Sequence, residues 1–457
     1  MPTTTKNPPV RASQRAAIGW GLIVVIVAPL LFSQLKQFEH ERSVRLLRDA
    51  GADVKVGLEG EQIVAVEFRD VTIDAATVRR VLEQRTVRRL SFTNCAFEAG
   101  TLRSLAGLPE LDTLNLRQLK AAAPGDLQHL LKTSALISLT LADHTITSKS
   151  LELNTTRLRS VDLYRCSGAT VELITLLARA PAMRSLRCDG TPLPLTLCRQ
   201  IVRERPDVDF EIAPDGIREF HPLTSRGARL ELNEHLEAVG LTVWHEDEPI
   251  PPELIRNLPN LTHVQLHYID VERTLLEALT QLEDLQSLSL SGSRVDADVL
   301  RLLTALPRLR KLHLDGVSTT SGEDIELPSL PRLQTLTATS TAISDRTLDG
   351  LDLEDLEILS LGERISSRGL QRLLAPGTVH TLALSRQPVD AGLLETIHSC
   401  PRLRNLLLYG CEVKEEQLTN GPLPENLKTL RLTGTRMSPE AVKALRAAHP
   451  QLQVLFW

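Results

Sequence analysis

Leucines recur in this chain with a period of about 24 residues, and no other feature of the sequence constrains its fold as strongly. Residues 285–308 and 403–426 share one arrangement, with leucine at positions 1, 4 and 6 and an apolar residue at position 11. Within two runs the first positions are 22 to 25 residues apart: Ile63, Val87, Leu111, Leu136, Leu158 and Met183, then Leu236, Leu261, Leu285, Leu309, Leu333, Leu356, Val379, Leu403, Leu427 and Leu452. Such self-similarity predicts elongated arrays of stacked repeats.

The spacing of the leucines indicates what each repeat forms. Positions 4 and 6 lie on one face of a short strand, and the next 15 or so residues return as a helix or an irregular turn. Neither half buries its apolar face alone, so stacked copies give a parallel sheet inside a curve and helices outside it. Helix-start signals accompany the returning segments, as at Ser438 before Pro439 and at Asp296 before Ala297. The predicted fold class is an α/β solenoid.

Charge and aromatic content exclude some classes of function. The chain has 52 Lys and Arg against 57 Asp and Glu, and 7 of these cations but only 3 of the acids lie in the first 50 residues. The remainder therefore holds 45 cations against 54 acids, a balance of -9. Nucleic-acid binding depends on a basic footprint, so nucleic acid is not expected as a partner. An aromatic content of 3% suits leucine cores in stacked repeats.

Residues 16–35 contain no charged side chain and predict a single transmembrane anchor. Twenty residues of helix extend about 30 Å, enough to cross a bilayer. A cleaved signal peptide is the main alternative, but the apolar run is long for one and ends in Leu31, Phe32, Ser33 and Gln34 without a small-x-small site. A buried core helix is the third reading. A basic tail, residues 1–15, precedes the segment.

The orientation of the anchor follows from the cations at its two ends. Three precede the segment and four follow it, but the trailing four are interleaved with Glu39, Glu41 and Asp49. We therefore favour a cytoplasmic N-terminus, with the repeats on the extracytoplasmic side of a single-pass membrane protein.

Three cysteines, Cys95, Cys166 and Cys411, occupy position 9 of their repeats. With this pattern, residues 40–457 resemble the cysteine-containing, ribonuclease-inhibitor-like class of leucine-rich repeat, and more narrowly bacterial membrane-anchored proteins of that type. In this class position 9 carries Asn or Cys that hydrogen-bonds the turn. The resemblance therefore implies buried structural thiols, not catalytic or metal-binding ones.

The same resemblance suggests two arrays in tandem. In the family a helix ending at a glycine turn often leads into the repeats, and residues 41–57, with Gly51 as helix stop and Val54 and Val56 in a first strand, match it. Arrays end with a helix, a proline and a last strand, which occurs near residues 198–212 and again at the C-terminus. The predicted parts are an N-terminal cap beginning with a helix (36–62), a first array (63–212), a linker (213–229) and a second array (230–457).

No catalytic or cofactor motif is present in the sequence. P-loop, dinucleotide, nucleophile-elbow and HExxH patterns are all missing, and the repeats leave no inserted domain to hold an active site. The chain is therefore predicted to be no enzyme and to need no cofactor. His263 and His267 lie about 13 Å apart on one strand, and His313 lies two strands away, so the three histidines are not expected to bind a metal.

Strand positions 3, 5 and 7 point away from the core and form the surface that curved solenoids use for binding. Most of these residues are small and polar, including Ser287, Ser289, Thr335, Thr337, Ser360 and Thr381. Early in the second array the outward residues are larger, and we expect a partner surface comprising Trp244, His263, Gln265, His267, Tyr268, Lys311 and His313. The alternative reading is that these are tolerated surface residues.

These features predict a membrane-tethered module that binds a protein or a polysaccharide through the concave sheet. The alternative is a cytosol-facing adaptor resembling the F-box type of leucine-rich-repeat protein, although an apolar segment occupies the place where that type carries its F-box. A purely structural scaffold is a further alternative.

Overall fold

The computed structural model describes residues 34–57, 62–120, 124–133, 136–146, 153–245, 249–348, 351 and 353–457. The chain divides into two compact units, Met1–Arg218 and Glu219–Trp457. Residues 16–33 of the predicted anchor lie outside the described residues. No helix in the described part of the chain is long and apolar enough to cross a membrane.

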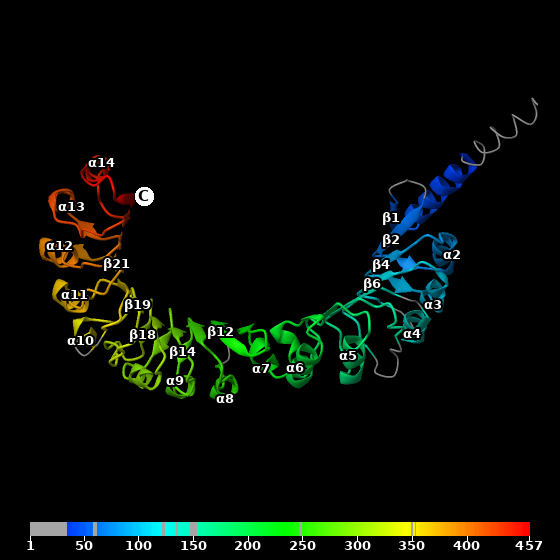
Figure 1. Cartoon of the computed structure of the whole chain (residues 1–457), viewed down its shortest axis with the longest axis horizontal. Coiled ribbons are helices and arrows are strands. Elements are labelled where there is room, and N and C mark those ends of the chain that lie inside the picture. The colour runs from blue at the N-terminus through cyan, green and yellow to red at the C-terminus, as the bar shows by residue number, and fades with distance from the viewer. Residues whose placement is uncertain are drawn as a thin grey trace, which may run out of the picture. The chain divides into compact units, whose positions relative to one another are not determined.

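The first unit is built on an eight-stranded sheet with helices along one face (Figure 1). The strands are β1 (Ala52–Val56), β2 (Ile63–Arg69), β4 (Arg89–Thr93), β6 (Thr113–Arg117), β7 (Ser138–Ala142), β8 (Ser160–Tyr164), β9 (Ser185–Arg187) and β10 (Asp209–Glu211). The helical segments are residues 34–49, α2 (Ala75–Glu83), α3 (Thr101–Ser104), α4 (Pro124–Thr133), α5 (Val171–Ala178) and α6 (Leu195–Glu204), with 3-10 turns at Leu105–Gly107 and Pro214–Gly216. Short strands β3 (Thr72–Ile73) and β5 (Ala96–Phe97) pair beside the main sheet.

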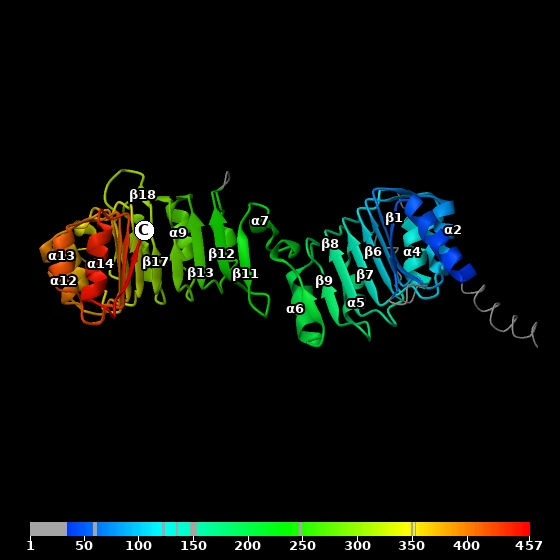
Figure 2. The same ribbon diagram turned by 90° about the horizontal axis from the view of Figure 1, so that it is seen from above.

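The second unit repeats this plan with an eleven-stranded sheet, whose strands lie side by side in Figure 2. They are β11 (Arg229–Leu232), β12 (Ala238–Trp244), β13 (His263–His267), β15 (Ser287–Ser289), β17 (Lys311–His313), β19 (Thr335–Ala338), β20 (Ile358–Leu361), β21 (Thr381–Ser385), β23 (Asn405–Tyr409), β25 (Thr429–Thr433) and β26 (Gln453–Phe456). The helices are α7 (His221–Thr224), α8 (Pro252–Arg256), α9 (Arg273–Leu279), α10 (Asp345–Leu348), α11 (Ser367–Leu374), α12 (Ala391–His398), α13 (Glu415–Asn420) and α14 (Pro439–Ala448), with a 3-10 helix at Val299–Ala305. Short strands β14 (Asp270–Val271), β16 (Arg294–Val295) and β18 (Ser318–Thr319), and β22 (Pro388–Val389) with β24 (Glu412–Val413), form two small parallel sheets.

The predicted α/β repeat fold is confirmed by the pairing of these strands. Apart from the first strand of each sheet, every neighbouring pair is parallel, and each residue pairs with one 22 to 25 positions later, as Val66 with Leu90 and Leu382 with Leu406. Before the last strand of each sheet the side chains at positions 4 and 6 are buried, and Leu114 and Leu288 are fully so. Burial of this apolar face between strands and helices is the main source of stability.

Most repeats turn away from their strand through a left-handed residue at position 8. Asn94, Gln118 and Tyr268 have φ values of 56°, 53° and 59°, and Gly292 and Gly316 take the same conformation at 72° and 70°. The backbone then bends so that position 9 lies beneath the strands. This corner is the local feature that converts a strand into a coil of the solenoid.

In several repeats position 9 carries a buried thiol or hydroxyl that hydrogen-bonds the preceding coil. The thiols of Cys95, Cys166 and Cys411 donate to the carbonyl at position 6 of the previous repeat, at 3.5, 3.3 and 3.2 Å. Thr191 and Ser293 donate to the equivalent carbonyls at 3.2 and 3.1 Å. All six cysteines are buried and free of disulfides, and burial raises the pKa of Cys166 to about 11. Buried structural thiols, as predicted, are what the structure contains.

Two of the first positions that we predicted were wrong. Gly240 pairs with His263, which places Ala238 at position 1 of β12, whereas Leu236 lies in the preceding turn with φ 56°. At the C-terminus Thr429 pairs with Gln453, so the first position falls one residue before Leu452. β12 is the first parallel strand of this sheet, beside the antiparallel β11, and β26 is its last strand.

Of the two predicted helix starts, the one at Ser438 is confirmed and the one at Asp296 is wrong. Ser438 caps α14 through its hydroxyl, which accepts the Ala441 N–H at 3.2 Å. Asp296 starts no helix: its carboxylate accepts the Thr320 hydroxyl at 2.5 Å, and the 3-10 helix begins at Val299.

The second unit begins with a cap that the sequence did not reveal. In the first unit, the predicted strand containing Val54 and Val56 is present as β1, antiparallel to β2, and it follows the helix 34–49 and a left-handed Gly51. At the start of the second unit, residues 213–229, predicted as linker, contain α7 and a left-handed Gly227, after which β11 pairs antiparallel to β12. The two caps share one pattern: Leu47, Gly51, Ala52 and Val54 match Leu223, Gly227, Ala228 and Leu230 in spacing, and the apolar members are buried.

The position-9 hydrogen bonds give a stability prediction. The fully buried Thr191 hydroxyl accepts the Cys166 N–H and donates to the Leu163 carbonyl, both at 3.2 Å. Thr191→Val keeps the shape but leaves two buried backbone groups unsatisfied, and should lower the free energy of unfolding by about 1–3 kcal/mol. Thr140→Val, at an outward position, should change it by no more than about 0.5 kcal/mol. Guanidinium unfolding measures both, and equal effects would contradict this role of position 9.

Candidate functional site

The outward face of the second sheet presents its side chains in rows that run across the strands. Gln265, Ser289, His313 and Thr337 pair in sequence and form the row at position 5. Trp244 and His267 pair in the row at position 7. Residues about 24 apart in sequence therefore lie next to one another on this face.

Trp244 and His267 form the centre of the predicted partner surface. The two rings stack with centroids 4.3 Å apart and planes at 27°, and Trp244 is 53% exposed. The Nε2 atom of His267 lies 3.4 Å from Oε1 of Gln265. Burial lowers the pKa of His267, and a hydrogen bond with the Ser291 backbone partly opposes this shift. Trp244, His267 and Gln265, three residues of the predicted partner surface, therefore lie together. We call the stacked rings of Trp244 and His267 the aromatic step.

Two serines separate this step from the next large side chain. Ser289 and Ser291 follow in the neighbouring coil, and their hydroxyls lie 3.0 Å apart. On β17, His313 bonds the Thr337 hydroxyl at 3.1 Å, and burial lowers its pKa, with Lys311 and His267 adding to the shift and Asp315 opposing it. Because serine side chains are short, Ser289 and Ser291 form a shallow strip, the serine strip, between the Trp244–His267 step and His313.

His263 belongs to the cap of the array instead of the exposed step. Its Nε2 lies 2.7 Å from Glu231 Oε2 on β11, and its Nδ1 lies 3.0 Å from the Thr262 hydroxyl. The ring lies where a side chain on Gly240 would be, since a Cβ there would meet Nε2 at 2.1 Å. The sequence grouped His263 with His267 and His313 because all three occupy outward strand positions. In the structure the contacts of His263 instead hold β11 against the sheet.

Tyr268 lies just beyond the sheet, at the left-handed position 8. Its ring covers Gly292 of the next coil, where a Cβ would meet the ring at 2.4 Å, and 61% of the residue is exposed. Tyr268 also lines a hollow of about 540 Å³ with Pro251, Asp270 and Glu272. Positive φ is uncommon for a bulky residue, and Tyr268 shares this conformation with Gln118, Arg165 and Arg386 at the same position of their repeats.

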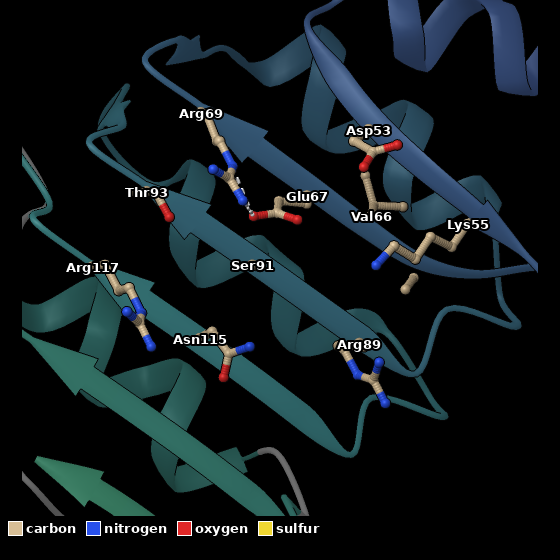
Figure 3. A pocket seen from close by; sticks show the side chains of 11 residues that line it. Asp53, Lys55, Val66, Glu67, Arg69, Arg89, Ser91, Thr93, Asn115 and Arg117 are labelled. Atoms are coloured by element: carbon tan, nitrogen blue, oxygen red, sulfur yellow. Dashed lines mark hydrogen bonds and ion pairs between the residues drawn. The ribbon is translucent and has the colours of Figure 1, made fainter. Parts of the chain in front are cut away.

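A second hollow lies on the outward face of the first sheet, and sequence reasoning missed it. It measures about 420 Å³ and is lined by four cations, two acids and smaller residues of β1, β2, β4 and β6, shown in Figure 3. Its cations are separated by 14 to 28 residues in sequence, so no local motif marks them. Counting positions 3, 5 and 7 across adjacent repeats would have found it.

The described part of the chain contains no candidate metal centre. Among those residues, no three His, Cys, Asp or Glu side chains converge in a way that could hold a metal ion. The outward face offers hydrogen bonding, charge and aromatic contact.

Comparison with known proteins assigns the repeat family. A family model for the LRR repeats of an FBD-associated F-box protein matches residues 58–200. This chain is a leucine-rich-repeat protein. The family match and the coil geometry together carry that assignment. A search of curated protein sequences finds no match.

Several solved structures are similar to this leucine-rich-repeat protein. An internalin from Listeria monocytogenes aligns at 14% identity and a TM-score of 0.32, over 86% of this chain and 93% of the internalin. The LRR ectodomain of the plant membrane receptor kinase GASSHO1/SCHENGEN3 from Arabidopsis thaliana aligns at 17% and 0.29, over 85% and 46%. The mouse RP105/MD-1 complex aligns at 16% and 0.37, over 74% and 70%.

The contact between Tyr268 and Gly292 is testable by a matched pair of variants. Gly292→Ala and Gly316→Ala both place a side chain at positive φ, which costs about 1–2 kcal/mol. Only Gly292→Ala also meets the Tyr268 ring, since the nearest atom to a Cβ on Gly316 is 3.6 Å away. The chain has three tyrosines, so fluorotyrosine labelling should give three ¹⁹F resonances. The Tyr268 signal should move in Gly292→Ala and stay in Gly316→Ala; the reverse would refute the contact.

Proposed function

We propose that this leucine-rich-repeat protein is a non-catalytic, membrane-tethered module that binds a partner protein through the outward face of its second sheet. The observation that carries the proposal is the exposed Trp244 ring stacked on His267 beside the serine strip. An indole held in place by a neighbour loses little side-chain entropy on binding, and Trp is enriched where interfaces derive most of their energy.

The partner surface comprises Trp244, Gln265, His267, Tyr268, Lys311 and His313, with His263 as support for the first strand. Aromatic contact is concentrated at the step, while Lys311 and the half-buried His313 supply polar contacts two strands away. This combination of an aromatic centre and a polar rim is typical of protein recognition. A protein is therefore favoured over a polysaccharide as the ligand.

Membrane tethering rests on the sequence of residues 16–35, which contains no charge over a length sufficient to span a bilayer. With a cytoplasmic N-terminus, both units would face the extracytoplasmic side. The second candidate function is a cytosol-facing adaptor of the F-box type. It is favoured by the family match to repeats of an FBD-associated F-box protein over residues 58–200.

Topology distinguishes these two functions. The full chain with a C-terminal tag is expressed in cells whose outer layers are then permeabilised, and protease is added. Loss of the tag is expected, because extracytoplasmic repeats are accessible to the protease. A tag that stays protected until the inner membrane is lysed would contradict the proposed orientation and favour the adaptor.

The role of Trp244 is tested by site-specific photo-crosslinking in the same cells. A benzophenone amino acid replacing Lys311 should crosslink a partner protein, whereas the same probe replacing Arg273 on the helical side should not. Trp244→Ala should reduce the adduct at least about tenfold, equivalent to about 1.4 kcal/mol.

Trp457→Ala is the matched control for this experiment. Trp457 is 65% exposed and lies at position 7 of the last repeat in the same sheet. Its removal should leave the adduct unchanged. Equal losses from the two tryptophan variants would argue against a partner surface centred on Trp244.

A further inference from the structure

The hollow on the first sheet is organised by strand register into two cationic rows. Lys55 pairs with Ala65 and Ala65 with Arg89, so two cations flank an alanine in the row at position 3. In the row at position 7, Arg69 pairs with Thr93 and Thr93 with Arg117. In each row the two cations are two strands apart, about 10 Å, and the rows are separated by four residues, about 13 Å.

A polar floor lies between the two rows. The row at position 5 runs from Asp53 and Glu67 at one end to Ser91 and Asn115 at the other, with Thr93 and Ala65 beside Ser91. Figure 3 shows Arg89 and Arg117 at opposite ends of this floor, with Asn115 between them. The small side chains leave the hollow of about 420 Å³ open, and the hydroxyl and amide groups offer hydrogen bonds to an occupant.

The cations of the hollow are only partly neutralised. Arg69 forms an ion pair with Glu67, whose Oε1 lies 2.7 Å from Nη2. Lys55, Arg89 and Arg117 are exposed and have no ion pair with any residue that the structure describes. On the same sheet Arg187 is paired with Glu211 at 2.5 Å, so unpaired cations are not general there. The four cations outnumber Asp53 and Glu67 by two, in a chain of net charge -5.

We propose that this hollow binds an extended acidic peptide segment, with one carboxylate between Lys55 and Arg89 and a second beside Arg117. In an extended chain, side chains four residues apart lie about 13 Å apart on the same face, which matches the separation of the two rows. Arg is well suited to carboxylates because its planar guanidinium donates two parallel hydrogen bonds. The Ser91 hydroxyl and Asn115 amide lie where the peptide backbone between the acids would pass.

The composition of the hollow favours a peptide over other polyanions. Bases of single-stranded nucleic acid bind mainly by stacking on aromatic rings, and none of the residues lining this hollow is aromatic. The site lies in the unit that does not carry the Trp244–His267 step, so it is independent of the proposed partner surface.

The test uses the full chain in detergent micelles and a fluorescein-labelled peptide, Gly-Asp-Ser-Gly-Ser-Asp-Gly, followed by fluorescence anisotropy. We expect saturable binding that weakens as salt rises, because screened charges contribute less. The peptide with Asn in place of both Asp residues should bind at least about tenfold more weakly. Equal binding of the two peptides would overturn the proposal.

Paired variants assign the binding to the hollow. Arg89→Gln with Arg117→Gln should weaken binding at least about tenfold, whereas Arg79→Gln with Arg103→Gln, exposed arginines on α2 and α3, should change it less than twofold. Arg89→Lys with Arg117→Lys keeps the charge and should retain binding within about threefold, which separates loss of charge from loss of folding. Equal losses in both glutamine variants would overturn the site.

Two further probes decide the class of ligand and the independence of the site. Phosphatidylglycerol vesicles and polyuridylate should bind more weakly than the acidic peptide. Tighter binding of either, with the same dependence on Arg89 and Arg117, would replace the peptide assignment. Trp244→Ala should leave peptide affinity unchanged, so that failure of this site and failure of the proposed partner surface give different results.

Discussion

The constraint on which both units depend is that each coil completes its hydrogen bonds only through its neighbours. A strand of three to five residues has no stability by itself, and in several repeats the side chain at position 9 has its acceptor in the preceding coil, as Cys166 has in Leu141. The left-handed residue at position 8 makes this contact possible by turning the chain beneath the sheet. These contacts fix the register of the strands, and the buried leucines then stabilise the stacked coils.

Fixed register also determines how chemistry is distributed on the outward face. Because each residue pairs with one about 24 positions later, a functional group is a row across strands, not a motif along one. Trp244 with His267, and Lys55 with Arg89 across Ala65, arise in this way. A smooth scaffold can therefore carry separate surfaces of different character, one aromatic and one cationic, through substitutions that leave the buried positions unchanged.

The sequence predicted the repeat phase where leucine fills the buried positions of the strands. It failed at the first parallel strand of the second sheet, in the second cap and at contacts between side chains of different coils. Ala238 carries too little apolar area to mark a first position, and Leu236 beside it lies in a turn. Helix α7 has four residues, too few to show a helical period, so the second cap read as linker. The cationic hollow and the Tyr268–Gly292 contact join residues from different coils, and only a count of positions across repeats would have brought them together.

The two caps share one design, and each supplies the antiparallel strand that covers the first edge of its sheet. An uncovered edge invites pairing with other chains. Since each array protects its own beginning, coils can be gained or lost within one array without leaving an open edge in the other. The number of repeats in each unit is thus free to change separately during evolution, and with it the spacing available for new rows of side chains.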